Sequence, residues 1–185
     1  MLKLEERTGL PDALRVLVET LPRSGWDKHP NFNDIIRFWL DRHLMFRDVL
    51  DRLRVGSEGY LDGQIDPVAH AQETQRYGGF LLNQLHTHHQ VEDQHYFPQL
   101  NGLDARISDG FELLDADHNA LDGHIHAMAD TMNATLQVVS GSEARDRVGT
   151  LHTGLIRFHR FLDRHLTDEE ELVVPVILTY APDLR

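Results

Sequence analysis

The sequence predicts an all-α protein, an up-down-up-down four-helix bundle with an N-terminal helical arm. Three observations predict this fold. Apolar residues recur with steps of three and four along four long segments. Short stretches rich in glycine, serine or proline separate these segments. No segment shows the strict apolar–polar alternation that is typical of a strand. We expect the arm at residues 1–30, the bundle at residues 31–178 and a tail at residues 179–185.

The arm and the first long helix are predicted from turn residues and apolar spacing. In the arm, Pro11 suits a first helical turn and apolar residues follow at helical spacing, so we expect a short helix packed on the outside of the bundle. The first long helix should begin near Asn31 or Asn33, both good N-caps, and end at the glycines of residues 56–59. Its stripe consists of Ile36, Trp39, His43, Phe46, Leu50 and Leu53.

The second long helix is expected from Pro67 to about Phe97. Asp66 precedes the proline and suits an N-cap, and the Gly78-Gly79 pair should bend the helix or let a neighbour approach closely. Its stripe consists of Leu81, Leu85, His88, Glu92 and Tyr96.

The third and fourth helices complete the bundle. The third should start between residues 104 and 109 and end near residue 138, with the stripe Leu114, His118, Leu121, Ile125, Met128 and Met132. The fourth should span residues 142–174, because Pro175 is expected to break it. Its stripe consists of Leu155, Phe158, Leu162, His165, Glu169 and Leu172. The apolar residues 176–178 should pack back on the bundle.

Composition narrows the chemistry that the protein can perform. The chain has 185 residues, no cysteine and thirteen histidines, so a metal would be held by nitrogen and oxygen rather than by thiolate. A net charge of −12 argues against a nucleic-acid or membrane partner. No apolar run approaches the roughly 20 residues that span a bilayer, and the first residues lack the apolar core of a secretory signal. We therefore expect a cytoplasmic protein.

A histidine and carboxylate pattern occurs twice along the chain. On the second and fourth helices, a stripe histidine is followed four residues later by a glutamate, then by a second carboxylate, and six residues after the glutamate by a proline. The first and third helices each add one stripe histidine. Two such helical hairpins, paired side by side, would bring these side chains to a similar depth. The histidines are His43, His88, His118 and His165, and the glutamates are Glu92 and Glu169.

This pattern predicts a dinuclear metal centre. Polar side chains buried without partners cost on the order of a few kcal/mol each, and a histidine and a carboxylate four residues apart on a helix can hold one cation together. Asp122 lies four residues after His118 and completes a third such pair. The alternative is a metal-free polar network in the core. The predicted ligands are His43, His88, Glu92, His118, Asp122, His165 and Glu169.

The pattern resembles the hemerythrin-like, or HHE cation-binding, family over roughly residues 31–178. The resemblance rests on His88-His89-x-x-Glu92-Asp93, on Phe97-Pro98 after it, and on the spaced histidines of the other helices. It implies a four-helix bundle with a non-haem di-iron centre, and hence two iron ions as the cofactor, with manganese or zinc as alternatives.

Two positions depart from the hemerythrin pattern. Hemerythrins carry a histidine where this chain has Asp122, and an oxygen ligand there would favour oxidative turnover over reversible dioxygen carriage. Alternatively, Asp122 lies behind the ligands and His124 or water takes its place. Their carboxylate on the fourth helix corresponds to Glu170, but the internal repeat and the stripe select Glu169, which we predict as the ligand.

Two classes of function fit these ligands. The first is a protein that binds dioxygen, nitric oxide or iron itself for sensing, storage or detoxification. The alternative is a di-iron enzyme with peroxidase, catalase-like or oxidase activity at the same site. Because both would use the same ligands, the sequence assigns no catalytic residue. The expected partner is a small molecule such as dioxygen, nitric oxide or peroxide.

Overall fold

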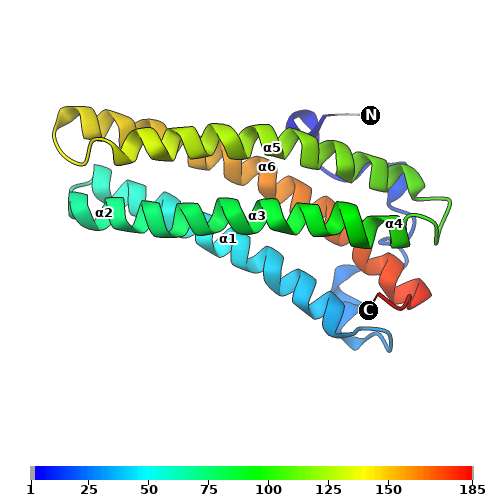
Figure 1. The fold of residues 1–185 in the computed structure, drawn as a ribbon. Helices are drawn as coiled ribbons and strands as arrows, with labels where there is room; N and C mark the ends of the chain where they lie inside the picture. The colour runs from blue at the N-terminus through cyan, green and yellow to red at the C-terminus, as the bar shows by residue number, and fades with distance from the viewer. Residues whose placement is uncertain (1–2, 185) are drawn as a thin grey trace. The chain divides into compact units, whose positions relative to one another are not determined.

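The computed structural model describes residues 3–184 and confirms the all-α prediction. None of these residues forms a strand. The helices are shown in Figure 1 and are α1 (Asp34–Leu61), α2 (Pro67–Glu73), α3 (Gly79–Val91), α4 (Phe97–Leu100), α5 (Ser108–Leu136) and α6 (Ser142–Tyr180). No helix in the described part of the chain is long and apolar enough to cross a membrane.

Two of the predicted N-caps are present. The side chain of Asn33 accepts hydrogen bonds from the backbone N–H groups of Ile35 and Ile36, both at 3.1 Å, and so begins α1. Asp66 accepts from the N–H groups at positions 68 and 69, at 2.9 and 3.1 Å, with Pro67 at the first position of α2. Each cap satisfies N–H groups that have no partner inside the helix, and is worth about 1 kcal/mol relative to alanine.

Helix α1 does not end at the glycines of residues 56–59, as the sequence predicted, but continues to Leu61. Gly59 instead lets the side chain of Ile65 pack closely against the helix, because a Cβ at this position would lie 2.7 Å from a side-chain carbon of Ile65. The reversal after the helix uses Gly63, whose φ of 71° falls in the left-handed region that favours glycine.

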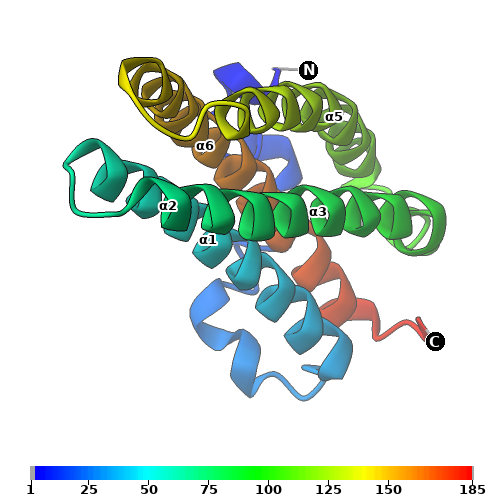
Figure 2. The same ribbon diagram turned by 60° about the vertical axis from the view of Figure 1, so that its left-hand side comes forward.

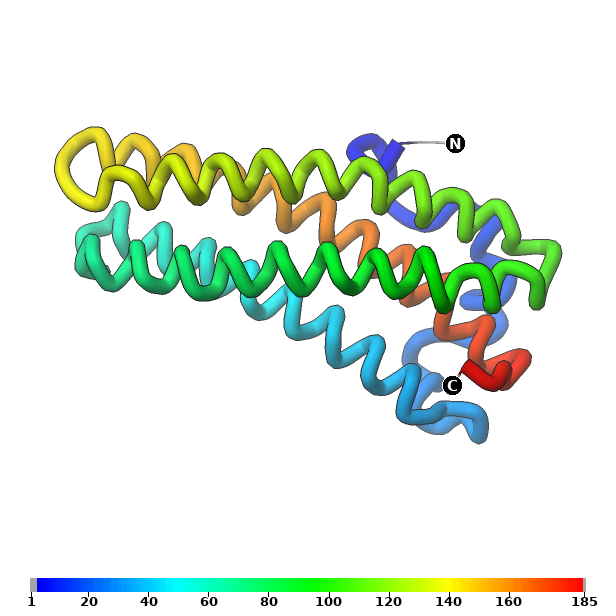
Figure 3. The backbone as a smooth tube through the Cα atoms, in the orientation of Figure 1, coloured from blue at the N-terminus to red at the C-terminus, as the bar shows by residue number. Residues whose placement is uncertain are grey.

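Helix α6 does not break at Pro175, which lies in its interior, but continues to Tyr180. The tube in Figure 3 stays helical into the red part of the chain. A proline inside a helix costs about 3 kcal/mol, because it removes one hydrogen bond and crowds the preceding turn. Burying one large apolar side chain contributes about 1.5–3 kcal/mol. Five apolar neighbours of the proline are fully buried and together outweigh that cost; they are Val173, Val174, Val176, Ile177 and Leu178.

The predicted second helix is interrupted by two π-helical turns, Thr74–Gly78 and Glu92–Tyr96. Gly78 in the first turn lies so close to Met132 that a Cβ would come within 2.5 Å of its sulfur, which confirms the predicted close approach. The second turn begins at Glu92, one of the predicted ligands. Such turns insert an extra residue into a helix and occur often at functional sites.

The chain divides into two compact units. Unit 1 consists of Met1–His43, His88–Ala120 and Asp163–Arg185, and unit 2 of Leu44–Thr87 and Leu121–Leu162. In unit 2, the buried stripe residues match the predicted ones and include Leu50, Leu53, Leu81, Leu85, Leu121, Ile125, Met128, Met132, Leu155 and Phe158.

In unit 1, the N-terminal segment is part of the core rather than a helix on the outside. It forms three short 3₁₀ turns, Leu4–Glu6, Asp12–Leu14 and Arg23–Lys28. Its apolar side chains belong to one buried cluster with residues of α1, α4, α5 and α6, and are Leu10, Leu14, Leu17, Val18 and Trp26. Figure 2 shows the beginning of this segment, in dark blue, beside α5 and α6.

Candidate metal centre

Unit 1 gathers seven potential ligands into two groups, within each of which one donor atom per residue lies within 4.8 Å of the others. The first group is His43, His88, Glu92 and Glu169. The second group is His89, His118 and His165. All of these residues belong to unit 1.

The first group joins side chains from α1, α3, the second π-helical turn and α6. The Nε2 atoms of His43 and His88 lie 3.0 Å apart. His88 Nε2 lies 2.9 Å from Glu92 Oε1, as the four-residue spacing predicts. His43 Nε2 lies 3.4 Å from Glu169 Oε1, to which the indole N–H of Trp39 also donates a hydrogen bond.

The second group joins α3, α5 and α6 through imidazoles alone. The Nε2 atoms of His118 and His165 lie 3.2 Å apart. The ring of His89 stacks on that of His118, with centroids 4.1 Å apart and an angle of 14° between the planes. It meets the ring of His165 edge-on at 5.3 Å.

The two glutamates connect the groups. Glu92 turns Oε1 to His88 and Oε2 to His118, at 2.9 and 3.6 Å. Glu169 turns Oε1 to His43 and Oε2 to His165, at 3.4 and 3.2 Å. Each carboxylate therefore presents one oxygen to each group, which is the arrangement expected of two bridging ligands between two cations.

Several atoms at the centre lack hydrogen bonds, although they are buried. Counted as carboxylates, both oxygens of Glu92 and Oε2 of Glu169 accept none, and neither ring nitrogen of His89 has a partner among the described residues. Each such group costs about 1–3 kcal/mol, and buried polar atoms are nearly always paired. Cations held at the two groups would satisfy the carboxylate oxygens and one ring nitrogen of His89, so the residues present fit a dinuclear site.

Carboxylates outside the two groups orient three of the histidines. The Nδ1 atom of His118 lies 2.7 Å from Asp93 Oδ1, and that of His165 lies 3.5 Å from Asp117 Oδ2. His43 Nδ1 lies 2.9 Å from Glu170 Oε1. A carboxylate at Nδ1 fixes the ring with Nε2 turned to the metal and makes that nitrogen a better ligand.

The two glutamates of the centre have opposite tendencies to ionise. Burial and the negative charge of Glu169 raise the pKa of Glu92 well above its usual value. Burial also disfavours a charge on Glu169, but the neighbouring His43 and His165 prevail and lower its pKa well below the usual value. Within this pair of carboxyls, Glu92 therefore holds a proton more readily and the negative charge resides preferentially on Glu169.

The histidines also differ in their affinity for protons. Burial lowers the pKa of His88 and of His89 well below the usual value, which keeps both rings neutral and ready to bind a cation. Burial acts in the same sense on His165, but its contacts with Asp117 and Glu169 prevail and raise its pKa to about 9.

The raised pKa of His165 predicts a pH dependence for the metal-free protein. Its proton stabilises the fold fully below the unfolded pKa of 6.5, and this contribution is lost as the pH rises toward 9. We expect the free energy of unfolding to fall by at most about 3 kcal/mol over this window.

Urea unfolding of chelator-treated protein at several pH values measures this change in stability. His165→Gln should flatten the slope and His86→Gln, an exposed histidine, should keep it; a wild-type stability that rises from pH 6.5 to 9 would contradict the assignment.

The structure does not bring Asp122, one of the seven predicted ligands, to either group. It belongs to unit 2 and to neither group. Its carboxylate is half exposed and pairs with His86 at 3.5 Å. His124, the proposed substitute, is also absent from both groups, and its ring lies tilted against that of Phe161. The remaining six predicted residues lie in the two groups, Glu169 among them, whereas Glu170 lies behind His43.

His89 is the member of the centre that the stripe analysis missed. Neighbouring residues on a helix point about 100° apart. His88 turns to His43 on α1, while His89 turns to His118 on α5 and to His165 on α6. The adjacent pair of histidines was the available signal, because a helix with neighbours on two sides can use two consecutive residues.

One comparison with known proteins identifies a family. The family model described as "Hemerythrin HHE cation binding domain" matches residues 34–177, which is most of the chain. No curated protein and no solved structure gives a significant match.

Proposed function

Because this chain belongs to the hemerythrin HHE cation-binding domain family, we propose that it holds two iron ions, one at each group, and binds a small ligand there. The observation that carries the proposal is the pair of glutamates, Glu92 and Glu169, each of which turns one oxygen to each group while three of those four oxygens accept no hydrogen bond.

The donor set supports iron. Five imidazoles, which are borderline donors, and two carboxylates, which are hard donors, together suit iron, zinc and manganese, and no cysteine is present to select a softer ion. Bound iron would supply the electrons that dioxygen or nitric oxide accepts when it binds. The protein contributes the two carboxylates and keeps His88 and His89 neutral, so that their nitrogens are available.

The burial of the centre supports a small ligand over a large substrate. The side chains of both groups are at most 4% exposed, except that of His88 at 12%. Dioxygen, nitric oxide and peroxide are small enough for such a site, and larger molecules are not. We therefore propose sensing, storage or detoxification of a diatomic ligand or of iron as the role.

The experiment is anaerobic loading of the purified chain with ferrous iron, followed by metal analysis and by visible spectra before and after dioxygen or nitric oxide. We expect about two iron ions per chain, as in other dinuclear bundle sites, and absorption that depends on the added gas. His88→Ala should lose metal, whereas His86→Ala, two residues away and exposed, should not.

Two outcomes would change this proposal. No bound metal, or iron whose spectrum ignores both gases, would contradict it. Consumption of many equivalents of hydrogen peroxide per chain would instead support the enzymatic alternative at the same site.

A further inference from the structure

The N-terminal segment reaches the metal centre with two arginines. The family match begins at residue 34, so residues 3–33 lie outside it. Within unit 1, Arg7 and Arg23 of this segment contact carboxylates that in turn contact histidines of the two groups. Arg7 is connected in this way to the second group, and Arg23 to the first.

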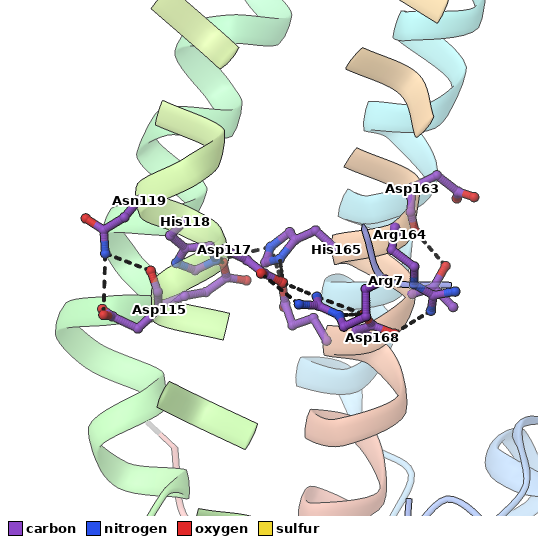
Figure 4. A network of polar contacts seen from close by, with 12 residues as sticks. Arg7, Asp115, Asp117, His118, Asn119, Asp163, Arg164, His165 and Asp168 are labelled. Carbon is purple, nitrogen blue, oxygen red and sulfur yellow. Dashed lines mark hydrogen bonds and ion pairs between the residues drawn. The ribbon is translucent and has the colours of Figure 1, made fainter. Parts of the chain in front are cut away.

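Arg7 lies between α5 and α6 and holds an aspartate on each (Figure 4). Its guanidinium donates to both oxygens of Asp117, through NH1 at 3.1 Å and through NH2. Its Nε donates to Asp168 Oδ2 at 2.9 Å. The side chain is 2% exposed, so this is a fully desolvated ion pair. The two aspartates directly precede His118 and Glu169 in the sequence.

Asp117 connects Arg7 to the second group. Its Oδ2, to which Arg7 donates, also lies 3.5 Å from Nδ1 of His165. A planar guanidinium that binds both oxygens of a carboxylate fixes the carboxylate plane, which a point charge such as lysine does not. The orientation of the carboxylate then sets the orientation of the imidazole.

Arg23 makes the corresponding contact for the first group. It forms an ion pair with Oε2 of Glu170, whose Oε1 lies 2.9 Å from Nδ1 of His43. Its guanidinium also lies over the ring of Trp26, 5.0 Å from the centroid. Glu170 is buried, whereas Arg23 is about half exposed, so the arginine reaches inward from the surface of the segment.

We propose that the N-terminal segment is part of the metal centre, and that Arg7 and Arg23 are positioning residues that hold His165 and His43 for metal binding through Asp117 and Glu170. The same series of contacts, from an arginine to a carboxylate to a histidine, occurs at both groups, and this repetition supports the proposal.

The test rests on the proposed metal site and uses cobalt(II) as a spectroscopic probe. The full-length variants are Arg7→Gln, Arg7→Lys, Arg23→Gln and the double change Arg7→Gln with Arg23→Gln. Arg157→Gln is the matched control, because this arginine is exposed, lies in unit 2 and makes none of these contacts. Each protein is titrated with cobalt(II), its ligand-field spectrum is recorded, and its helicity and unfolding are measured without metal.

Loss of a residue that contacts a ligand typically costs about 10- to 100-fold in metal affinity. Since the arginines act one contact further out, we expect about tenfold weaker binding for each glutamine variant and a shifted spectrum. Arg7→Lys should keep part of the affinity but not the wild-type spectrum. Arg157→Gln should match the wild type in both.

The outcomes separate this inference from the proposed function. If wild-type protein takes up no cobalt, the metal site itself is wrong. If it does, and folded Arg7→Gln and Arg23→Gln bind as tightly with the same spectrum, the positioning role is overturned. Should Arg7→Gln fail to fold, Arg23→Gln decides, because its half-exposed arginine can be lost without leaving a cavity in the core.

Discussion

Replacing His89 with leucine is expected to weaken metal binding at the second group by more than 100-fold, above the range of about 10- to 100-fold seen for residues that only support a ligand. The reason is that His89 would be one of three imidazoles at this group, and neither of its nitrogens has another partner among residues 3–184. Asp122→Asn, at the position predicted from the spacing after His118, should leave metal binding unchanged. Metal content and cobalt(II) titration of both variants measure this.

A second signature distinguishes loss of a ligand from loss of stability. The two ring nitrogens of His89 are buried without hydrogen bonds, and each such atom costs about 1–3 kcal/mol in the metal-free protein. Leucine has a similar volume and no polar atom, so the metal-free variant should unfold at the same or a higher urea concentration than the wild type. Weaker metal binding together with equal or greater metal-free stability is therefore the expected combination.

The opposite results would identify a different ligand set. If Asp122→Asn lost metal and His89→Leu did not, the oxygen ligand predicted from the sequence would be right and the geometry of the second group wrong. If neither variant lost metal, the first group alone would hold the bound ion.

Regular helix spacing is the reason that most of the candidate site could be predicted from the sequence. His43, His88, His118 and His165 each lie in an apolar stripe, and a stripe residue must turn to the core because its neighbours at three and four positions do. The same argument placed Glu92 and selected Glu169 over Glu170, and the structure places both chosen residues in the first group. Six of the seven predicted residues therefore lie in the two groups, and apolar periodicity together with the internal repeat was enough to select them.

Features that depend on two elements at once could not be predicted this way. Asp122 follows His118 at the same four-residue spacing as Glu92 follows His88, but its place on α5 puts it beside His86 and solvent. Pro175 stays inside α6 because of the apolar residues packed around it, which no local rule includes. No pattern around Arg7 in the sequence distinguishes it from the other arginines, because its contact with Asp117 forms only in the folded chain.

Metal binding is expected to slow amide hydrogen exchange more in unit 1 than in unit 2. All seven members of the two groups lie in unit 1, on α1, α3, the π-helical turn at Glu92, α5 and α6. A ligand that binds only the folded state adds about 2.7 kcal/mol at a free concentration of 100 times Kd. Openings that separate these side chains must give up that binding energy, whereas openings confined to residues 44–87 or 121–162 need not.

The comparison is made on the same protein with chelator, with ferrous iron under anaerobic conditions, and with magnesium as the matched control. Magnesium prefers oxygen ligands and retains its water, so a group of imidazoles should not bind it. Protection by iron but not by magnesium, concentrated in peptides around His43, His88, His118 and His165, is the expected pattern. Equal protection of both units would mean that the metal stabilises the fold without being held at these residues. Protection by magnesium would mean that charge neutralisation between Glu92 and Glu169, rather than coordination by imidazole, is what a cation provides at this centre.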